Sequence, residues 1–94
     1  MVFEFDATKS QANQAKHGLD FSEAQKLWQD VDAVELSARS DVEIRLILVA
    51  RLENRTWAAV YTERGDRIRI ISVRPARTNE KAIYDQTEND CAES

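Results

Sequence analysis

Near the N-terminus, hydrophobic positions first alternate and then recur with the spacing of a helix. Residues 3–5, Phe-Glu-Phe, alternate as a short strand does, and Asp6 is a good N-cap, so we expect a strand and then a helix over 7–17. Gly18 can take the left-handed conformation that ends a helix. A second amphipathic helix is predicted over 22–30, because its first four residues, Ser-Glu-Ala-Gln, form a capping box.

From Val31 onward, hydrophobic positions recur every second residue, which predicts strands. The nearly continuous apolar run at 45–49 is typical of a central strand. Polar residues at 52–55 predict one hairpin loop, and the sequence Arg-Gly-Asp at 64–66 predicts a tight turn of three residues. The expected strands cover residues 34–36, 45–49, 56–62 and 67–74.

The C-terminal part predicts a short last helix and a tail. Pro75 ends the last strand, and Thr78 can cap a helix that ends near Tyr84. A length of 94 residues allows one small domain, which we place at 1–86, followed by a flexible acidic tail at 87–94. Helices and antiparallel hairpins in separate parts of the chain indicate an α+β fold.

Composition excludes several classes of protein. The longest apolar run, 46–50, is far shorter than the roughly 20 residues of a membrane span, and the acidic N-terminus does not resemble an export signal. A single cysteine, Cys91, cannot form an internal disulfide, which fits a cytoplasmic protein. One histidine and two glycines leave no serine hydrolase motif and no glycine-rich loop for nucleotide phosphates.

Metal binding is also disfavoured. Asp30 and Asp32 have a spacing that can hold magnesium, but no third ligand follows nearby, so we expect a turn there. We expect no metal site and no cofactor.

Charge is unevenly distributed along the chain. The net charge is −4, yet the segment 39–81 carries nine Arg and one Lys against six acidic residues. Five of these Arg lie within 64–77, beside only one acid. Arg presents a planar fork that matches phosphate or carboxylate oxygens, so this patch indicates a binding site. The alternative is that these Arg only keep one face of a sheet soluble.

Two further groups of residues have candidate chemistry. Lys9, Asn13 and Lys16 share one face of the first helix, with His17 beside them; the alternative is a solvated face whose His interacts with the helix dipole. A three-residue hairpin turn would place Glu63 opposite Arg67 and Tyr61 opposite Arg69, on one face of the sheet. That cluster could bind a phosphate and move protons, or could be an ion pair beside a packed tyrosine.

An early Lys-His-Gly at 16–18 and a late Arg-Ile-Ile-Ser at 69–72 occur together in this chain. The accompanying motif positions are Phe3-Glu4-Phe5-Asp6, Lys9, Asn13, Phe21, Ala24, Glu43, Arg45, Tyr61-Thr62-Glu63-Arg64, Arg74, Ala76, Glu80 and Tyr84. Over residues 3–84 this combination closely resembles the BrnT family, the ribonuclease toxins of type II toxin–antitoxin systems. Phe5, Ala50-Arg51 and Val73 depart from that family's usual Trp, Gly and Ala.

The resemblance implies a RelE-like fold, with two N-terminal helices packed on a mainly antiparallel sheet and a short C-terminal helix. It also implies a cytoplasmic endoribonuclease that cuts RNA without a metal, by attack of the 2′-hydroxyl, and inhibits translation. A cognate BrnA-like antitoxin with a ribbon-helix-helix fold would neutralise the toxin, and the toxin would reach DNA only through that partner. No contact with a membrane is expected.

We combine this resemblance with the residue patterns to assign roles. Catalytic roles are predicted for His17, Glu63, Arg64, Arg69 and Arg74, and RNA-binding roles for Lys9, Lys16, Tyr61 and Arg67. The three catalytic Arg would contact the cleaved phosphate, and His17 or Glu63 would move protons. Alanine at Arg69 or Arg74 should abolish toxicity and leave the fold intact. The alternatives are a module that binds RNA or protein without cutting, and a degenerate toxin that only stabilises its antitoxin.

Overall fold

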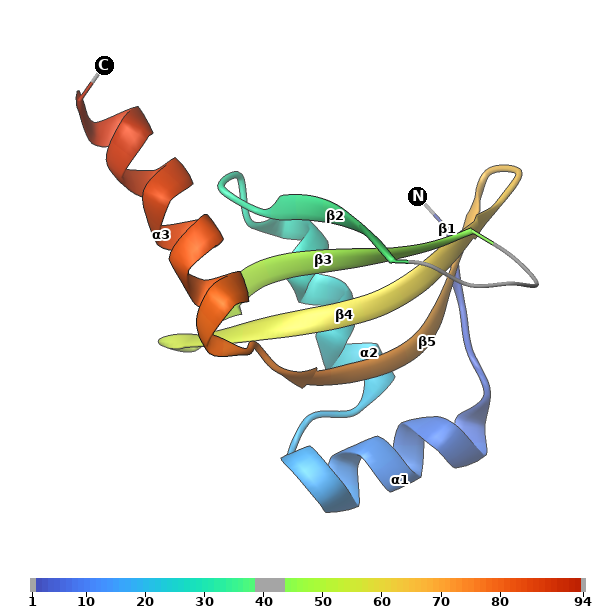
Figure 1. Cartoon of the computed structure of the whole chain (residues 1–94). Helices are drawn as coiled ribbons and strands as arrows, with labels where there is room; N and C mark the ends of the chain where they lie inside the picture. Colours follow the sequence, from blue (N-terminus) through green and yellow to red (C-terminus); the bar gives the residue numbers. More distant parts are fainter. Residues whose placement is uncertain (1, 39–43, 94) are drawn as a thin grey trace.

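The computed structural model describes residues 2–38 and 44–93, with side chains as far as residue 86. Glu43 and the side chain of Cys91, both discussed above, lie outside that part. The described strands form one sheet in the order β1-β5-β4-β3-β2, in which only β1 and β5 are parallel (Figure 1). They are β1 (Val2–Glu4), β2 (Val34–Ala38), β3 (Arg45–Leu52), β4 (Arg55–Arg64) and β5 (Arg67–Pro75). The α+β class is confirmed, and the strand predicted as central, β3, lies inside the sheet beside the middle strand β4.

The first helix, α1 (Ala7–His17), begins and ends where the sequence predicts. The Asp6 carboxylate accepts hydrogen bonds from the backbone N–H groups of Thr8, at 2.8 Å, and Lys9, at 3.2 Å. Gly18 ends the helix with φ of 82° and donates its N–H to the carbonyl of Gln14. Both ends are fixed by local chemistry, which explains the agreement.

The second helical segment differs from its prediction in start and in geometry. It consists of α2 (Phe21–Ala24) and a 3₁₀ helix, η1 (Gln25–Gln29). Its N-cap is Asp20, whose carboxylate accepts the N–H of Glu23 at 2.8 Å, so Ser22 lies inside the helix. Asp20 and Glu23 have the same spacing as a capping box that starts at Asp, and the earlier acid takes the cap.

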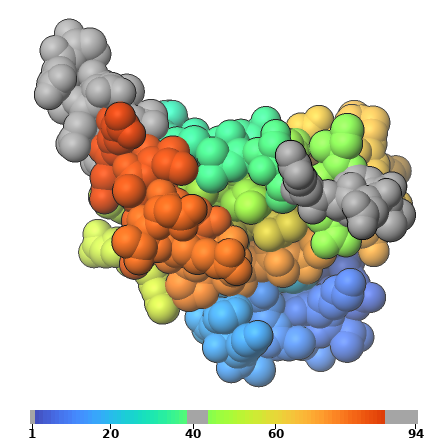
Figure 2. Space-filling model, viewed as in Figure 1, coloured from blue at the N-terminus to red at the C-terminus, as the bar shows by residue number. Residues whose placement is uncertain are grey.

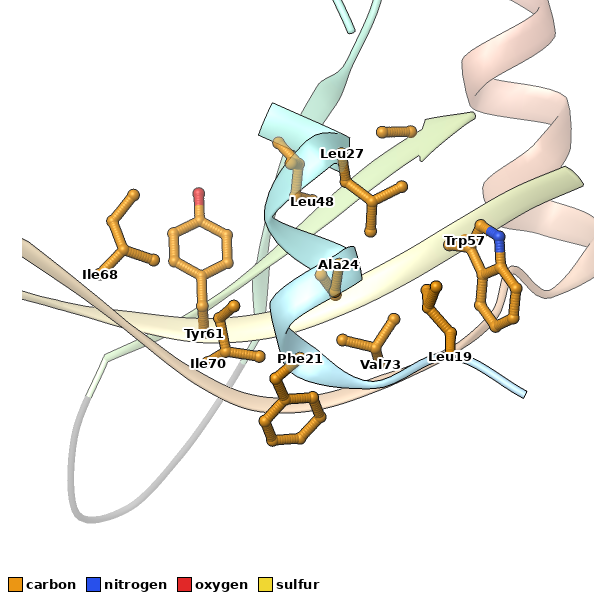
Figure 3. Packing of buried hydrophobic residues seen from close by; sticks show 12 residues of the cluster. Leu19, Phe21, Ala24, Leu27, Leu48, Trp57, Tyr61, Ile68, Ile70 and Val73 are labelled. Carbon is orange, nitrogen blue, oxygen red and sulfur yellow. The ribbon is translucent and has the colours of Figure 1, made fainter. Parts of the chain in front are cut away.

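Both faces of the sheet contribute to hydrophobic clusters. On one face, α2 and η1 insert Phe21, Ala24 and Leu27 against strand residues that include Tyr61 and Ile70 (Figure 3). On the opposite face, the start of α3 (Thr78–Glu93) covers Val49 with Ala76 and Tyr84, beside β2 and β3. We call this opposite side of the sheet the α3 face.

The hairpin between β4 and β5 has a two-residue turn, so the predicted three-residue turn is wrong. Arg64 pairs with Arg67 across Gly65 and Asp66, and φ of Gly65 is 61°. Glu63 therefore lies opposite Ile68, and Tyr61 opposite Ile70. A shift of one residue moves side chains to the other face of a strand, so Tyr61 lies in the core and the arginines do not share its face.

A β-bulge in β5 then changes which residues share a face. Tyr61 pairs with Ile70 and Val60 with Ser72, which leaves Ile71 as an extra residue in β5. Before the bulge the odd-numbered residues of β5 lie on the α3 face; after it the even-numbered ones do. The residues of β5 on the α3 face are therefore Arg67, Arg69, Ser72 and Arg74.

The last helix is longer than predicted and is capped differently. It runs to Glu93, where the sequence predicts an end near Tyr84, because no Gly or Pro interrupts residues 85–93. Thr78 is its first residue, and the carboxylate of Glu80 reaches back to accept the N–H of Arg77 at 2.7 Å. None of the described helices has the length and apolar character needed to cross a membrane.

Candidate functional site

A pocket of about 320 Å³ lies between α1 and β5. Its polar lining comes from both elements, although 49 residues of sequence, 18–66, separate them. In Figure 2, α1 is the blue layer along the lower edge of the molecule, below the orange strand atoms. The polar lining residues are Lys9, Asn13, Lys16, His17, Ser72 and Arg74.

Buried hydrogen bonds fix α1 against β5. The Asn13 side chain donates to the carbonyl of Leu19 at 2.7 Å and accepts the N–H of Val73 at 3.1 Å. Ser10 accepts the N–H of Phe21 at 2.9 Å. Because Asn13 and Ser10 are buried, this face of α1 is not simply a solvated face. Asn13 clamps the helix to the strand, and the lysines flank it.

The clamp brings two lysines, a histidine and an arginine to one pocket. Lys9 and Lys16 are exposed and His17 is partly exposed. Lys16 and His17 stand in the last turn of α1, where the helix dipole favours positive charge. Arg74 comes from β5, and its side chain is 22% exposed. This arrangement can bind phosphate oxygens and offers an imidazole for proton transfer.

Arg74 is held in place by a buried carboxylate. Its two terminal nitrogens donate to the two oxygens of Glu80 at 2.7 and 2.9 Å. The Glu80 side chain is only 5% exposed, and its hydrogen bonds from Arg74 hold its pKa below the usual range. The same contact raises the pKa of Arg74. Arg74 therefore borders the pocket and also anchors the start of α3.

Two of the predicted catalytic residues lie elsewhere. Glu63 and Arg64 line a different pocket, of about 400 Å³, at the hairpin end of β4. His17 borders a third pocket together with Trp57, near the other end of β4. Six residues of extended strand from Trp57 to Glu63 span about 20 Å. The structure does not bring His17 and Glu63 to one site.

Arg67 and Arg69 also lie away from the α1–β5 pocket. Both extend on the α3 face beside β1, where they approach the carboxylate of Glu4 at 3.7 and 4.0 Å. The predicted Glu63–Arg67 contact is replaced by this approach to Glu4. The five residues from Arg69 to Arg74 span about 16 Å of strand. Arg69 is directed to Glu4 and Arg74 to Glu80, so the structure does not bring their guanidinium groups to one point.

Tyr61 is a core residue. It is 1% exposed, packs edge-on against Trp28 at 5.2 Å between ring centroids, and donates its hydroxyl hydrogen to Glu35. Burial, with the hydrogen bond to Glu35 as a further cause, raises the pKa of this phenol above its usual value. In this position Tyr61 has no access to a substrate. This agrees with the alternative interpretation of the sequence, in which Tyr61 is a packed tyrosine and not a binding residue.

Asp30 occupies a turn, as predicted. Its two carboxylate oxygens accept hydrogen bonds from the N–H groups of Asp32 and Arg51 and from the hydroxyl of Tyr84, at 2.7 to 3.0 Å. The contact with Tyr84 joins α3 to the turn after η1. Within residues 2–38 and 44–86, no three His, Cys, Asp or Glu side chains are grouped to hold a metal ion.

Two residues that shape the site have no role predicted from the sequence. Glu80 fixes Arg74, and a signal was present in its position three residues after Arg77, where a Glu caps a helix start. Ser72 lines the pocket because of the bulge at Ile71, and the alternation of the strand contains no signal for it.

Comparison with known proteins agrees with the motifs. No curated protein matches this chain closely enough to be counted as a relative. A family model described as a ribonuclease toxin, BrnT, of a type II toxin–antitoxin system matches residues 5–80, which include all of the lining of the α1–β5 pocket. The chain therefore belongs to the BrnT family of ribonuclease toxins of type II toxin–antitoxin systems.

Proposed function

We propose that this chain is an endoribonuclease whose cleavage site is the α1–β5 pocket and which needs no metal ion. One observation carries the proposal: Lys9, Lys16, His17 and Arg74 line one pocket although they come from opposite ends of the sequence. Two lysines and an arginine beside an imidazole suit the chemistry of a phosphodiester, because their positive charges can neutralise the phosphate without a metal.

The proposed reaction uses the substrate's own nucleophile. The 2′-hydroxyl oxygen attacks the neighbouring phosphorus, the bond from phosphorus to the 5′-oxygen breaks, and a 2′,3′-cyclic phosphate forms. Neutral His17 accepts the proton of the 2′-hydroxyl, and the departing 5′-oxygen takes a proton from water. Arg74, Lys9 and Lys16 stabilise the negative charge that develops on the phosphate oxygens. His17 takes this role in preference to Glu63, which lines another pocket.

Membership of the family implies an antitoxin partner. We further propose that cleavage takes place in the cytoplasm and inhibits translation, and that the partner is a BrnA-like ribbon-helix-helix protein through which the complex reaches DNA. A RelE-like relationship of the fold belongs to the same proposal. These statements are supported by the family membership and by the motifs shared over residues 3–84.

The test is cleavage of a long single-stranded RNA in excess EDTA. We expect the wild-type protein to cut and His17→Ala to cut at least 100-fold more slowly, the range for loss of a general base. Lys26→Ala, which removes a cation on η1 remote from the pocket, should cut as the wild type does. Equal rates for His17→Ala and wild type would contradict the assignment of His17. Cleavage only with added magnesium would contradict metal independence, and RNA bound but left intact would favour the non-catalytic alternative.

A further inference from the structure

The two exposed arginines nearest the hairpin in β5 have no role in the pocket just described. Arg67 and Arg69 have side chains 60% and 36% exposed, and about 16 Å of strand separates Arg69 from Arg74. Neither arginine lines the pocket, so neither is placed to contact the cleaved phosphate. They can, however, contact a phosphate further along the same RNA strand.

We propose that Arg67 and Arg69 form a second phosphate-binding site, an exosite that holds single-stranded RNA two or three nucleotides from the cleaved bond. The proposal rests on the proposed function, because the position of the exosite is defined relative to the bond that is cleaved in the α1–β5 pocket. Its chemistry is the recognition of phosphodiester oxygens by guanidinium groups, without base readout.

The bulge in β5 supports a continuous track. In a regular strand, Arg69 and Arg74 would lie on opposite faces, since their positions differ by an odd number. The extra residue Ile71 places Arg67, Arg69, Ser72 and Arg74 on the α3 face. Neighbouring side chains on one face of a strand are about 6.6 Å apart, close to the separation of adjacent phosphates in an extended single strand. The polar groups of β5 thus lead from the hairpin to the pocket.

Among the described residues, α3 leaves this part of the sheet uncovered. The helix α3 packs beside β2 and β3, at the opposite edge of the sheet from Arg67 and Arg69. Figure 2 views the α3 face, with α3 covering its left part and the β4–β5 hairpin at the upper right.

Glu4 provides a second test, because its substitution should change RNA affinity in the opposite direction to substitution of the arginines. Its carboxylate lies 3.7 Å from Arg67 and 4.0 Å from Arg69, and it is partly exposed. These distances are too long for strong hydrogen bonds, so the contacts are weak and a phosphate can replace them. Glu4 therefore opposes RNA binding, and its removal should strengthen binding.

The first experiment measures binding of a single-stranded RNA of about 12 nucleotides whose 2′-hydroxyls are methylated to prevent cleavage. Arg67→Gln/Arg69→Gln should weaken binding about tenfold and reduce the log–log salt slope by about 1.4, because each phosphate contact contributes about 0.7 for single strands. Glu4→Gln should bind about threefold more tightly than wild type. The control Lys26→Gln/Lys81→Gln removes the same charge elsewhere and should bind within about twofold of wild type.

The second experiment separates the exosite from the cleavage site. In EDTA, Arg67→Gln/Arg69→Gln should cut a dinucleotide as the wild type does, and should show a raised KM with an unchanged kcat on the longer unmethylated RNA. Salt slope and KM equal to those of the lysine control would overturn the exosite. Absence of cleavage by the wild type would overturn the proposed function instead, and the binding experiment would still decide the exosite.

Discussion

The guanidinium of Arg74 borders the α1–β5 pocket and also binds Glu80 in the first turn of α3. Its bidentate contact with Glu80 satisfies a carboxylate that is 5% exposed and that also caps α3. The sequence predicted that alanine at this position leaves the fold intact; its signal for Glu80 concerned the helix cap and not the contact with Arg74. Because of this contact, we expect Arg74→Ala to reduce stability as well as activity.

We therefore expect Arg74→Ala to lower the free energy of unfolding by about 3 kcal/mol, because it leaves Glu80 buried without its partner. Urea denaturation monitored by circular dichroism measures the change. Arg69→Ala, which removes only the long contact with Glu4, should change stability by less than about 0.5 kcal/mol. Equal stability of the two variants would show that the Arg74–Glu80 pair does not hold the fold.

The same pair predicts a dependence on pH. The pKa of Glu80 lies below its ordinary value of 4.5 because of the hydrogen bonds from Arg74. A lowered pKa means that the contribution to stability is complete above that ordinary value and is lost as pH falls through the folded-state pKa. The stability difference between wild type and Glu80→Gln should therefore shrink as the pH falls below about 4.5. A difference that stays constant from neutral pH to pH 3 would contradict this.

Tyr61 provides a test at the residue that sequence and structure place differently. Tyr61→Phe keeps the ring in the core and removes only the hydroxyl bonded to Glu35. We expect RNA cleavage at the wild-type rate and a loss of stability of about 1 kcal/mol. A large fall in cleavage rate with normal stability would restore Tyr61 to the site.

Among the elements, α1 shows best what a sequence can predict. Asp6 and Gly18 fix its ends by short-range chemistry, and the polar face predicted for it lines the α1–β5 pocket. The register of the β4–β5 hairpin was wrong because strand alternation fixes neither the length of a turn nor the position of a bulge. The end of α3 was missed because charged residues continue a helix as well as they form a tail.

The attachment of α1 to β5 can be tested through its clamp. Asn13→Ala removes two buried hydrogen bonds, one of them to the N–H of Val73. It should lower the free energy of unfolding by about 2 kcal/mol and slow RNA cleavage, because the lysines and His17 lose their place beside Arg74. Gln11→Ala, at an exposed position of the same helix, is the matched control. Faster hydrogen exchange of α1 amides in Asn13→Ala alone would confirm the loosening.

For the molecule as a whole, the structure brings together fewer than half of the predicted site residues. Four of the nine predicted site residues, Lys9, Lys16, His17 and Arg74, meet in the α1–β5 pocket. The other five lie at the hairpin end of β4, on β5 near Glu4, or in the core. Contacts between distant segments depend on strand register, which the sequence does not fix. The net charge of −4 conceals this arrangement, since the described part of the basic segment, 44–81, contains β3, β4, β5 and the start of α3.

The central claim is that RNA is cut in the α1–β5 pocket and not at the hairpin end of the sheet. The most direct measurement compares two double variants on single-stranded RNA in EDTA: Lys16→Ala/His17→Ala and Glu63→Gln/Arg64→Gln. We expect a loss of at least 100-fold for the first and a rate near that of the wild type for the second. The reverse result would place the cleavage site at the hairpin and contradict the assignment to the α1–β5 pocket.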